Sequence, residues 1–125
     1  MSNHGGRQLD GAVATASVLP DITTAVNQRI PVLCDGGIRR GRHVLTALAL
    51  GATACLVARP HLWGLAVAGQ EGVEHVLDIY QRELDLAMGL CGIENVAEIS
   101  SELIFNPAAG LSGCLLYTSP SPRDS

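Results

Sequence analysis

Two short apolar runs, each followed by a helical period, constrain the fold of this chain most strongly. Residues 30–34 and 54–57 are apolar, and each run gives way to glycine or arginine. Apolar residues then recur at helical spacing through residues 42–50 and 73–91, and an earlier helix is predicted over residues 17–27. Runs this short and apolar are typical of parallel strands buried on both faces. The alternation therefore predicts an α/β fold.

The number of predicted strands indicates that the chain is part of a larger fold. Parallel strands that are buried on both faces need neighbouring strands, and the sequence predicts two strands in all. At 125 residues, the chain is also shorter than the roughly 200 residues that a complete (β/α)8 barrel requires. We therefore expect a fragment of a parallel sheet rather than a complete domain.

Charge is divided unevenly along the chain and points to a small anionic ligand. Residues 1–70 hold six arginines against three acidic residues, whereas residues 71–105 hold eight acidic residues against Arg82 alone. The chain contains no lysine, and arginine is better suited than lysine to fixed, forked contacts with phosphate or carboxylate. A nucleic-acid partner is not expected, because the net charge is -4 and aromatic residues do not alternate with the arginines.

The cysteine spacing and the hydropathy argue against a metal-binding protein and against a membrane protein. Cys34, Cys55, Cys91 and Cys114 lack the spacing of zinc ligands, so no metal is predicted, and the first two are expected to be buried thiols. No apolar segment is long enough for a membrane helix, and the first residues lack the pattern of a signal peptide. These features predict a cytoplasmic protein.

Residues 2–10, SNHGGRQLD, place an imidazole and a guanidinium three residues apart across two glycines. The ring of His4 is suited to accept a proton near neutral pH. Arg7 could bind a carboxylate through two parallel hydrogen bonds. The pair therefore suits an acidic substrate whose α-carbon faces the histidine. Taken alone, a polar segment of this kind is more often a simple turn.

Residues 35–41, DGGIRRG, lie between a predicted strand and a predicted helix. The glycines let backbone N–H groups approach a phosphate, the following helix adds a favourable dipole, and Arg39 or Arg40 supplies charge. Asp35 is expected at the carboxyl end of its strand, and Arg59, after the next strand, could reach the same phosphate. By itself the motif also fits ordinary glycine turns with solvated arginines.

Taken together, these segments resemble the FMN-dependent α-hydroxy acid dehydrogenases and oxidases. SNHGGRQLD, DGGIRRG and the stretches ALGA (residues 49–52) and VARP (residues 57–60) occur in the order and spacing of this family. The family includes glycolate oxidase, L-lactate oxidase and dehydrogenase, and mandelate dehydrogenase. The resemblance covers about residues 1–105 and implies the C-terminal βα units of a (β/α)8 TIM barrel, incomplete in this chain.

The resemblance also implies a role for each matching residue. His4 corresponds to the active-site base, and Arg7 corresponds to the arginine that binds the substrate carboxylate. The positions that correspond to FMN contacts are Ser2, His4, Asp35, Gly36, Gly37, Arg39, Ala58 and Arg59. The family usually has glycine where this chain has Ala58, so a methyl group is added beside the phosphate.

The implied reaction is oxidation of an L-2-hydroxy acid to the 2-oxo acid with reduction of FMN. A small 2-hydroxy acid such as lactate, glycolate or mandelate is thus the expected substrate, and the parent enzyme is expected to be a homo-oligomer. The electron acceptor stays open, as does the choice between proton and hydride transfer; a quinone acceptor would favour peripheral membrane association. The alternative is a non-catalytic barrel fragment that binds phosphate through DGGIRRG.

The family places a lysine and several tyrosines of the active site on earlier strands, which this sequence does not contain. We therefore expect the isolated chain to be inactive and to bind FMN weakly. Residues 106–125 read as an irregular tail without periodicity, and residues 114–124, CLLYTSPSPRD, match the translation of a sequencing-library adapter. We expect residues 114–124 not to belong to the functional protein.

Overall fold

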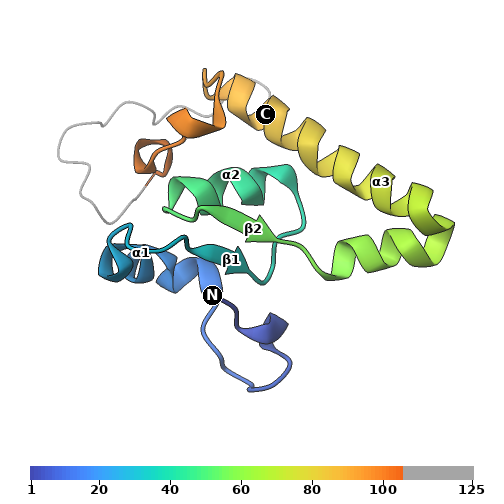
Figure 1. Ribbon diagram of the computed structural model, residues 1–125, viewed down its shortest axis with the longest axis horizontal. Coiled ribbons are helices and arrows are strands. Elements are labelled where there is room, and N and C mark those ends of the chain that lie inside the picture. The colour runs from blue at the N-terminus through green and yellow to red at the C-terminus, as the bar shows by residue number, and fades with distance from the viewer. Residues whose placement is uncertain (106–125) are drawn as a thin grey trace, which may run out of the picture.

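The computed structural model describes residues 1–105. Its elements are helix α1 (Thr15–Val26), strand β1 (Leu33–Asp35), helix α2 (Gly41–Ala49), strand β2 (Ala54–Leu56) and helix α3 (Arg59–Leu90), with 3-10 turns at His4–Gly6, Val96–Glu98 and Ser101–Leu103. Figure 1 shows the two paired strands, α2 lying beside β2, and α3 leaving the end of β2. The predicted tail, residues 106–125 with the adapter-like segment 114–124, lies outside the described residues.

The two strands are parallel, as the alternation of elements predicts. Cys34 lies opposite Cys55 in the ladder, and Asp35 lies opposite Leu56. Met1 pairs with β1 in the parallel sense. Its amino group donates to the Leu33 carbonyl at 2.8 Å, and its carbonyl accepts from the Asp35 N–H at 2.9 Å. The loops that follow Met1, β1 and β2 therefore leave from one edge.

One face of this small sheet forms the core. Leu19 of α1, Cys34 of β1 and Ala47 of α2 are buried together on that face. On the other face Leu33 is 39% exposed and Leu56 is 48% exposed. The prediction that both strands are buried on two faces is therefore wrong for the described residues, because helices cover one side and solvent meets the other.

Several element boundaries differ from the sequence prediction. Helix α1 begins at Thr15, two residues before the predicted start at residue 17. The Thr15 hydroxyl donates a hydrogen bond to the Gly36 carbonyl. Strand β1 ends at Asp35, one residue later than predicted. Beyond α3, residues 96–103 contain two separate 3-10 turns rather than a helix. The thiol of Cys55 is half-buried rather than fully buried.

Helix α3 begins fourteen residues earlier than the predicted helix 73–91 and bends sharply at Ala68 and Gly69. Across this bend Gly64 and Gly72 pack backbone against backbone, since a Cβ built on Gly72 would lie 1.9 Å from the Gly64 carbonyl oxygen. Glycine lowers helix propensity, so sequence periodicity failed to predict the first part of the helix. Within residues 1–105, no helix has both the length and the apolar content needed to cross a membrane.

Replacing Gly72 by alanine is expected to lower the free energy of unfolding by about 1 to 3 kcal/mol, because the added methyl group has no space. Gly89→Ala is the matched control in the same helix, since no atom lies within 4 Å of the position of its Cβ. That control should be neutral or stabilising by up to about 1 kcal/mol. Denaturant unfolding followed by circular dichroism measures both. Equal effects of the two substitutions would contradict the close packing of α3 on itself.

The cysteines should differ strongly in their reactivity. Burial raises the pKa of the Cys55 thiol to about 11, and burial also raises the pKa of Cys34. A raised pKa leaves little thiolate, which is the nucleophile, so iodoacetamide should label both slowly at mildly alkaline pH. Cys91 is exposed and should be labelled before Cys34 and Cys55. Peptide mass spectrometry measures the order of labelling, and denaturant should abolish the differences between the cysteines. Equal labelling of Cys55 and Cys91 in the folded chain would contradict the prediction.

Candidate active site

The segment that carries His4 is held against the end of β1 by a chain of hydrogen bonds. The Ser2 hydroxyl donates to the Asp35 carboxylate, and the His4 backbone N–H donates to the Ser2 hydroxyl at 3.0 Å. Asn3 closes the turn by accepting from the Gly5 N–H at 3.0 Å. His4 itself has a φ of 57°, a left-handed conformation that is uncommon for a residue with a side chain. The backbone therefore holds its ring at the carboxyl end of β1 through several contacts.

The glycine pair after β1 forms a turn that a side chain would obstruct. Gly36 has a φ of 102°, and a Cβ at this position would lie 2.8 Å from the Asn3 side-chain oxygen and 3.2 Å from the Thr15 hydroxyl. Gly37 also has a positive φ, of 78°, and the space where its Cβ would be built is open. Backbone groups of this turn are thus accessible to a ligand at Gly37 and packed against the His4 segment at Gly36.

The two arginines of DGGIRRG have different surroundings. Arg39 lines the cleft described below, whereas Arg40 forms an ion pair of 2.5 Å with Glu83 of α3. Hydrogen bonds from Arg40 and from the Gly41 N–H hold the pKa of the Glu83 carboxyl below its usual range. The residue types alone left open which arginine could supply charge to a ligand. Arg39, the one that the family resemblance implies, lines the cleft, and Arg40 does not. At the N-terminus of α2, the Gly41 N–H donates to Glu83, so this one donor is already occupied.

Arg59 connects the loop after β2 with the His4 segment. Its guanidinium nitrogen lies 3.1 Å from the position that a Cβ on Gly5 would occupy. The preceding Ala58 has a φ of -112° and a ψ of -76°. An L-residue tolerates a negative φ of this size, so the alanine in place of the family's usual glycine does not require a left-handed backbone here.

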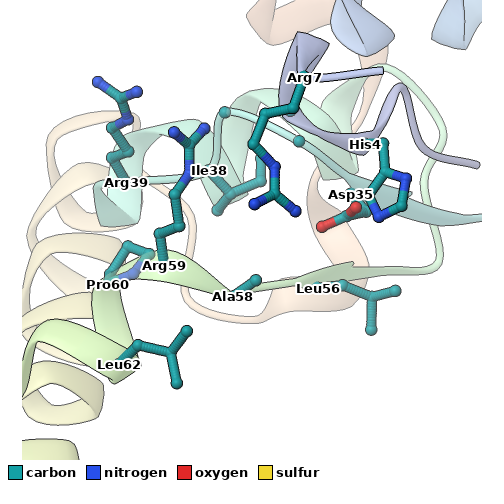
Figure 2. A pocket seen from close by; sticks show the side chains of 13 residues that line it. His4, Arg7, Asp35, Ile38, Arg39, Leu56, Ala58, Arg59, Pro60 and Leu62 are labelled. Atoms are coloured by element: carbon teal, nitrogen blue, oxygen red, sulfur yellow. The ribbon is translucent and has the colours of Figure 1, made fainter. Parts of the chain in front are cut away.

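These loops line an open cleft of about 160 Å³. Figure 2 shows His4 and Asp35 at one end, Arg39 at the other, and the guanidinium groups of Arg7 and Arg59 between them. The lining residues that the sequence predicted are His4, Arg7, Asp35, Gly36, Gly37, Arg39, Ala58 and Arg59. Ser2 is the one predicted residue outside this lining, and it holds Asp35 instead.

The cleft is electropositive and has the features that a phosphorylated cofactor needs. Three guanidinium groups face it, and within residues 1–105 the two ion pairs, Arg40–Glu83 and Arg82–Asp78, lie elsewhere. Apolar side chains of Ile38, Leu56 and Leu62 line the remaining wall. Arginines for a phosphate, a turn with an accessible backbone and an apolar wall for a ring system fit FMN.

Sequence reasoning missed the residues of α3 that support the DGGIRRG loop. The buried Tyr80 donates its hydroxyl hydrogen to the Ile38 carbonyl at 2.9 Å, and Glu83 accepts from Gly41 at 2.8 Å. Among the apolar residues that recur at helical spacing in 73–91, Tyr80 is buried, whereas Leu77 and Cys91 are exposed. The one sequence signal for Glu83 is the basic first part of the chain followed by an acidic second part.

The chain is similar in sequence to a known enzyme family and to several curated proteins. Residues 1–106 match the family described as FMN-dependent dehydrogenase. L-Lactate oxidase of Nostoc sp. is 54% identical over 104 residues, which are 83% of this chain and 28% of that protein. 2-Hydroxyacid oxidase 1 of Homo sapiens is 53% identical over 110 residues, which are 87% of this chain and 30% of that protein. The chain thus spans less than a third of the length of these curated relatives.

Solved structures agree with the sequence relatives. A mandelate oxidase in complex with 3,3-difluoro-2-hydroxy-3-phenylpropionic acid is 53% identical and superimposes with a TM-score of 0.77 over 80% of this chain and 30% of that chain. A mandelate oxidase variant with a monooxide FMN adduct is 55% identical, with a TM-score of 0.74 over 77% of this chain and 31% of that chain. With the match over residues 1–106, the chain belongs to the FMN-dependent dehydrogenase family.

Proposed function

We propose that the whole protein oxidises a small L-2-hydroxy acid to the 2-oxo acid with FMN as its cofactor. The observation that carries this proposal is the meeting of His4 and Arg7 with Arg39 and Arg59 in one cleft. The first pair suits a hydroxy acid, and the second pair suits a phosphate. The family membership and the names of the relatives, which are oxidases of lactate, 2-hydroxy acids and mandelate, support the same substrate class.

In this proposal, residues 1–105 form the last βα units of a (β/α)8 barrel. The exposed side chains of Leu33 and Leu56 would face the interior of that barrel, where earlier strands would cover them. The cleft lies at the carboxyl ends of β1 and β2, which is the end at which such barrels carry their active sites. Loops after the last two strands often bind phosphate in this architecture.

The cofactor phosphate would be held by Arg39 and Arg59, with the Gly37 backbone beside it. The Asp35 carboxylate, fixed by Ser2, would accept hydrogen bonds from the hydroxyl groups of the ribityl chain. When bound, the flavin supplies the electron chemistry by accepting the two electrons that leave the substrate. The protein contributes position and electrostatics around it.

Substrate binding and proton transfer fall to the His4 segment. Arg7 would bind the substrate carboxylate through a forked pair of hydrogen bonds, which fixes the α-carbon. A ring nitrogen of His4 would accept the proton that leaves the substrate, and the Asp35 carboxylate at the same end of the cleft would stabilise the resulting imidazolium. A binding-only fragment, the alternative function, gives neither His4 nor Arg7 a role.

His4→Ala is expected to lower the rate of flavin reduction by about 100- to 10,000-fold, the usual contribution of a positioned base. The test uses a chimera in which residues 1–105 replace the matching segment of the Nostoc L-lactate oxidase, 54% identical to this chain. Stopped-flow absorbance of the bound flavin measures reduction by lactate, glycolate and mandelate. His75→Ala removes an exposed histidine of α3 and is the control. Unchanged rates in His4→Ala would refute the base assignment.

Arg7→Ala should act mainly on substrate affinity. Loss of a forked charge-assisted contact is expected to lower kcat/KM by about 10- to 100-fold, with most of the change in KM. The same chimera serves for steady-state kinetics, and Arg82→Ala, which removes an exposed arginine of α3, is the matched control. An Arg7→Ala variant with an unchanged KM would show that another residue binds the carboxylate.

A further inference from the structure

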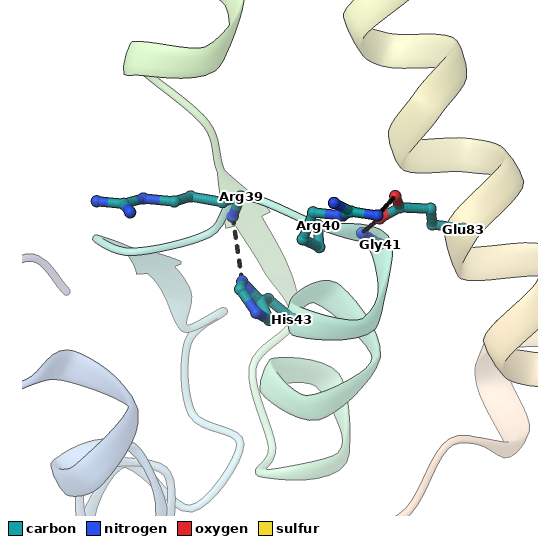
Figure 3. A network of polar contacts seen from close by, with 5 residues as sticks. All are labelled: Arg39, Arg40, Gly41, His43 and Glu83. Carbon is teal, nitrogen blue, oxygen red and sulfur yellow. Dashed lines mark hydrogen bonds and ion pairs between the residues drawn. The ribbon is translucent and has the colours of Figure 1, made fainter.

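Two consecutive arginines of the DGGIRRG loop point in opposite directions. Figure 3 shows the Arg39 side chain extending away from α3 and the Arg40 side chain extending toward it, where it meets Glu83. Both side chains are long and flexible, and a free cationic pair on a glycine-rich loop could exchange places. Something must therefore fix which guanidinium faces the cleft.

Glu83 is the residue that makes this distinction. One carboxylate oxygen pairs with the Arg40 guanidinium at 2.5 Å, and the other accepts the Gly41 backbone N–H at 2.8 Å. The contact is close, because a Cβ on Gly41 would lie 2.3 Å from the Leu84 backbone nitrogen. Helix α3 and the start of α2 are therefore locked together at this point.

The backbone at Ile38 and Arg39 is also held, by one residue of α3 and one of α2. Tyr80, one turn before Glu83, donates to the carbonyl of Ile38 at 2.9 Å. The backbone N–H of Arg39 donates to the Nδ1 atom of His43 at 3.2 Å. The residues on both sides of Arg39 are thus tied down, and its side chain is left to project into the cleft.

We propose that Glu83 is a positioning residue that aims Arg39 at the cofactor phosphate by holding Arg40 and Gly41 on α3. The inference rests on the proposed function, because it assigns the cofactor phosphate to Arg39. Glu83 neutralises Arg40, so the loop presents one guanidinium rather than two to the cleft. It also occupies the N–H at the start of α2, which directs an anion toward Arg39 and Arg59 instead.

The test compares two flavins that differ by the phosphate alone. Dissociation constants of FMN and riboflavin are measured by fluorescence titration of the same chimera, freed of its own flavin. Glu83→Ala is expected to raise the FMN dissociation constant about tenfold, because a charge-assisted network is lost, and to leave that of riboflavin within about twofold. Glu83→Gln keeps an oxygen that can accept the Gly41 N–H, so it should raise the FMN dissociation constant by about threefold.

Controls separate this role from a general structural one. Asp78→Asn removes another carboxylate of α3, which pairs with the exposed Arg82 rather than with the DGGIRRG loop, and should change neither constant. If Glu83→Ala does not fold, Glu83→Gln and Arg40→Ala provide the same comparison. Equal weakening of both flavins, or an unchanged FMN constant, would overturn the positioning role.

The unaltered chimera tests the proposed function separately. It should prefer FMN to riboflavin, and Arg39→Ala should remove most of that preference. Absence of the preference, or an Arg39→Ala variant that retains it, would refute the proposed phosphate site itself. A normal preference that depends on Arg39, together with unchanged binding in the Glu83 variants, would refute the positioning role alone.

Discussion

The parallel pairing of Met1, β1 and β2 is the constraint on which the rest of the structure depends. It brings the ends of three chain segments to one edge, so that residues far apart in sequence, such as His4, Arg39 and Arg59, line one cleft. The hydrogen bonds of Ser2 and Asn3 then fix the His4 turn to the end of β1. Without that ladder, the same polar loops would be separate solvated turns.

Charge separation within the fold gives the cleft its chemical character. The acidic helix α3 takes up Arg40 through Glu83, and the cleft retains Arg7, Arg39 and Arg59, which have no ion pair within residues 1–105. An anion that enters the cleft therefore meets guanidinium groups whose charge is not already neutralised. The same helix supports the loop backbone through Tyr80, while its first residues, Arg59 and Leu62 among them, line the cleft.

Much of the site could be predicted from the sequence because its residues lie in two short motifs. SNHGGRQLD and DGGIRRG hold most of the cleft lining, and local spacing is enough to recognise them. The elements were predictable in type and order, but the first part of α3 was not, since Gly64, Gly69 and Gly72 weaken the helical signal. Their use as close packing sites appears only when the two parts of the helix meet.

The sequence by itself determined the family resemblance, the parallel α/β arrangement and the candidate residues, because these follow from local motifs and the periodicity of apolar positions. Only the tertiary structure showed the different surroundings of Arg39 and Arg40, placed Ser2 behind Asp35, and brought Glu83 to the start of α2. The physical reason is that side-chain direction depends on partners from distant segments. A carboxylate more than forty residues away fixes the choice between two adjacent, chemically identical arginines.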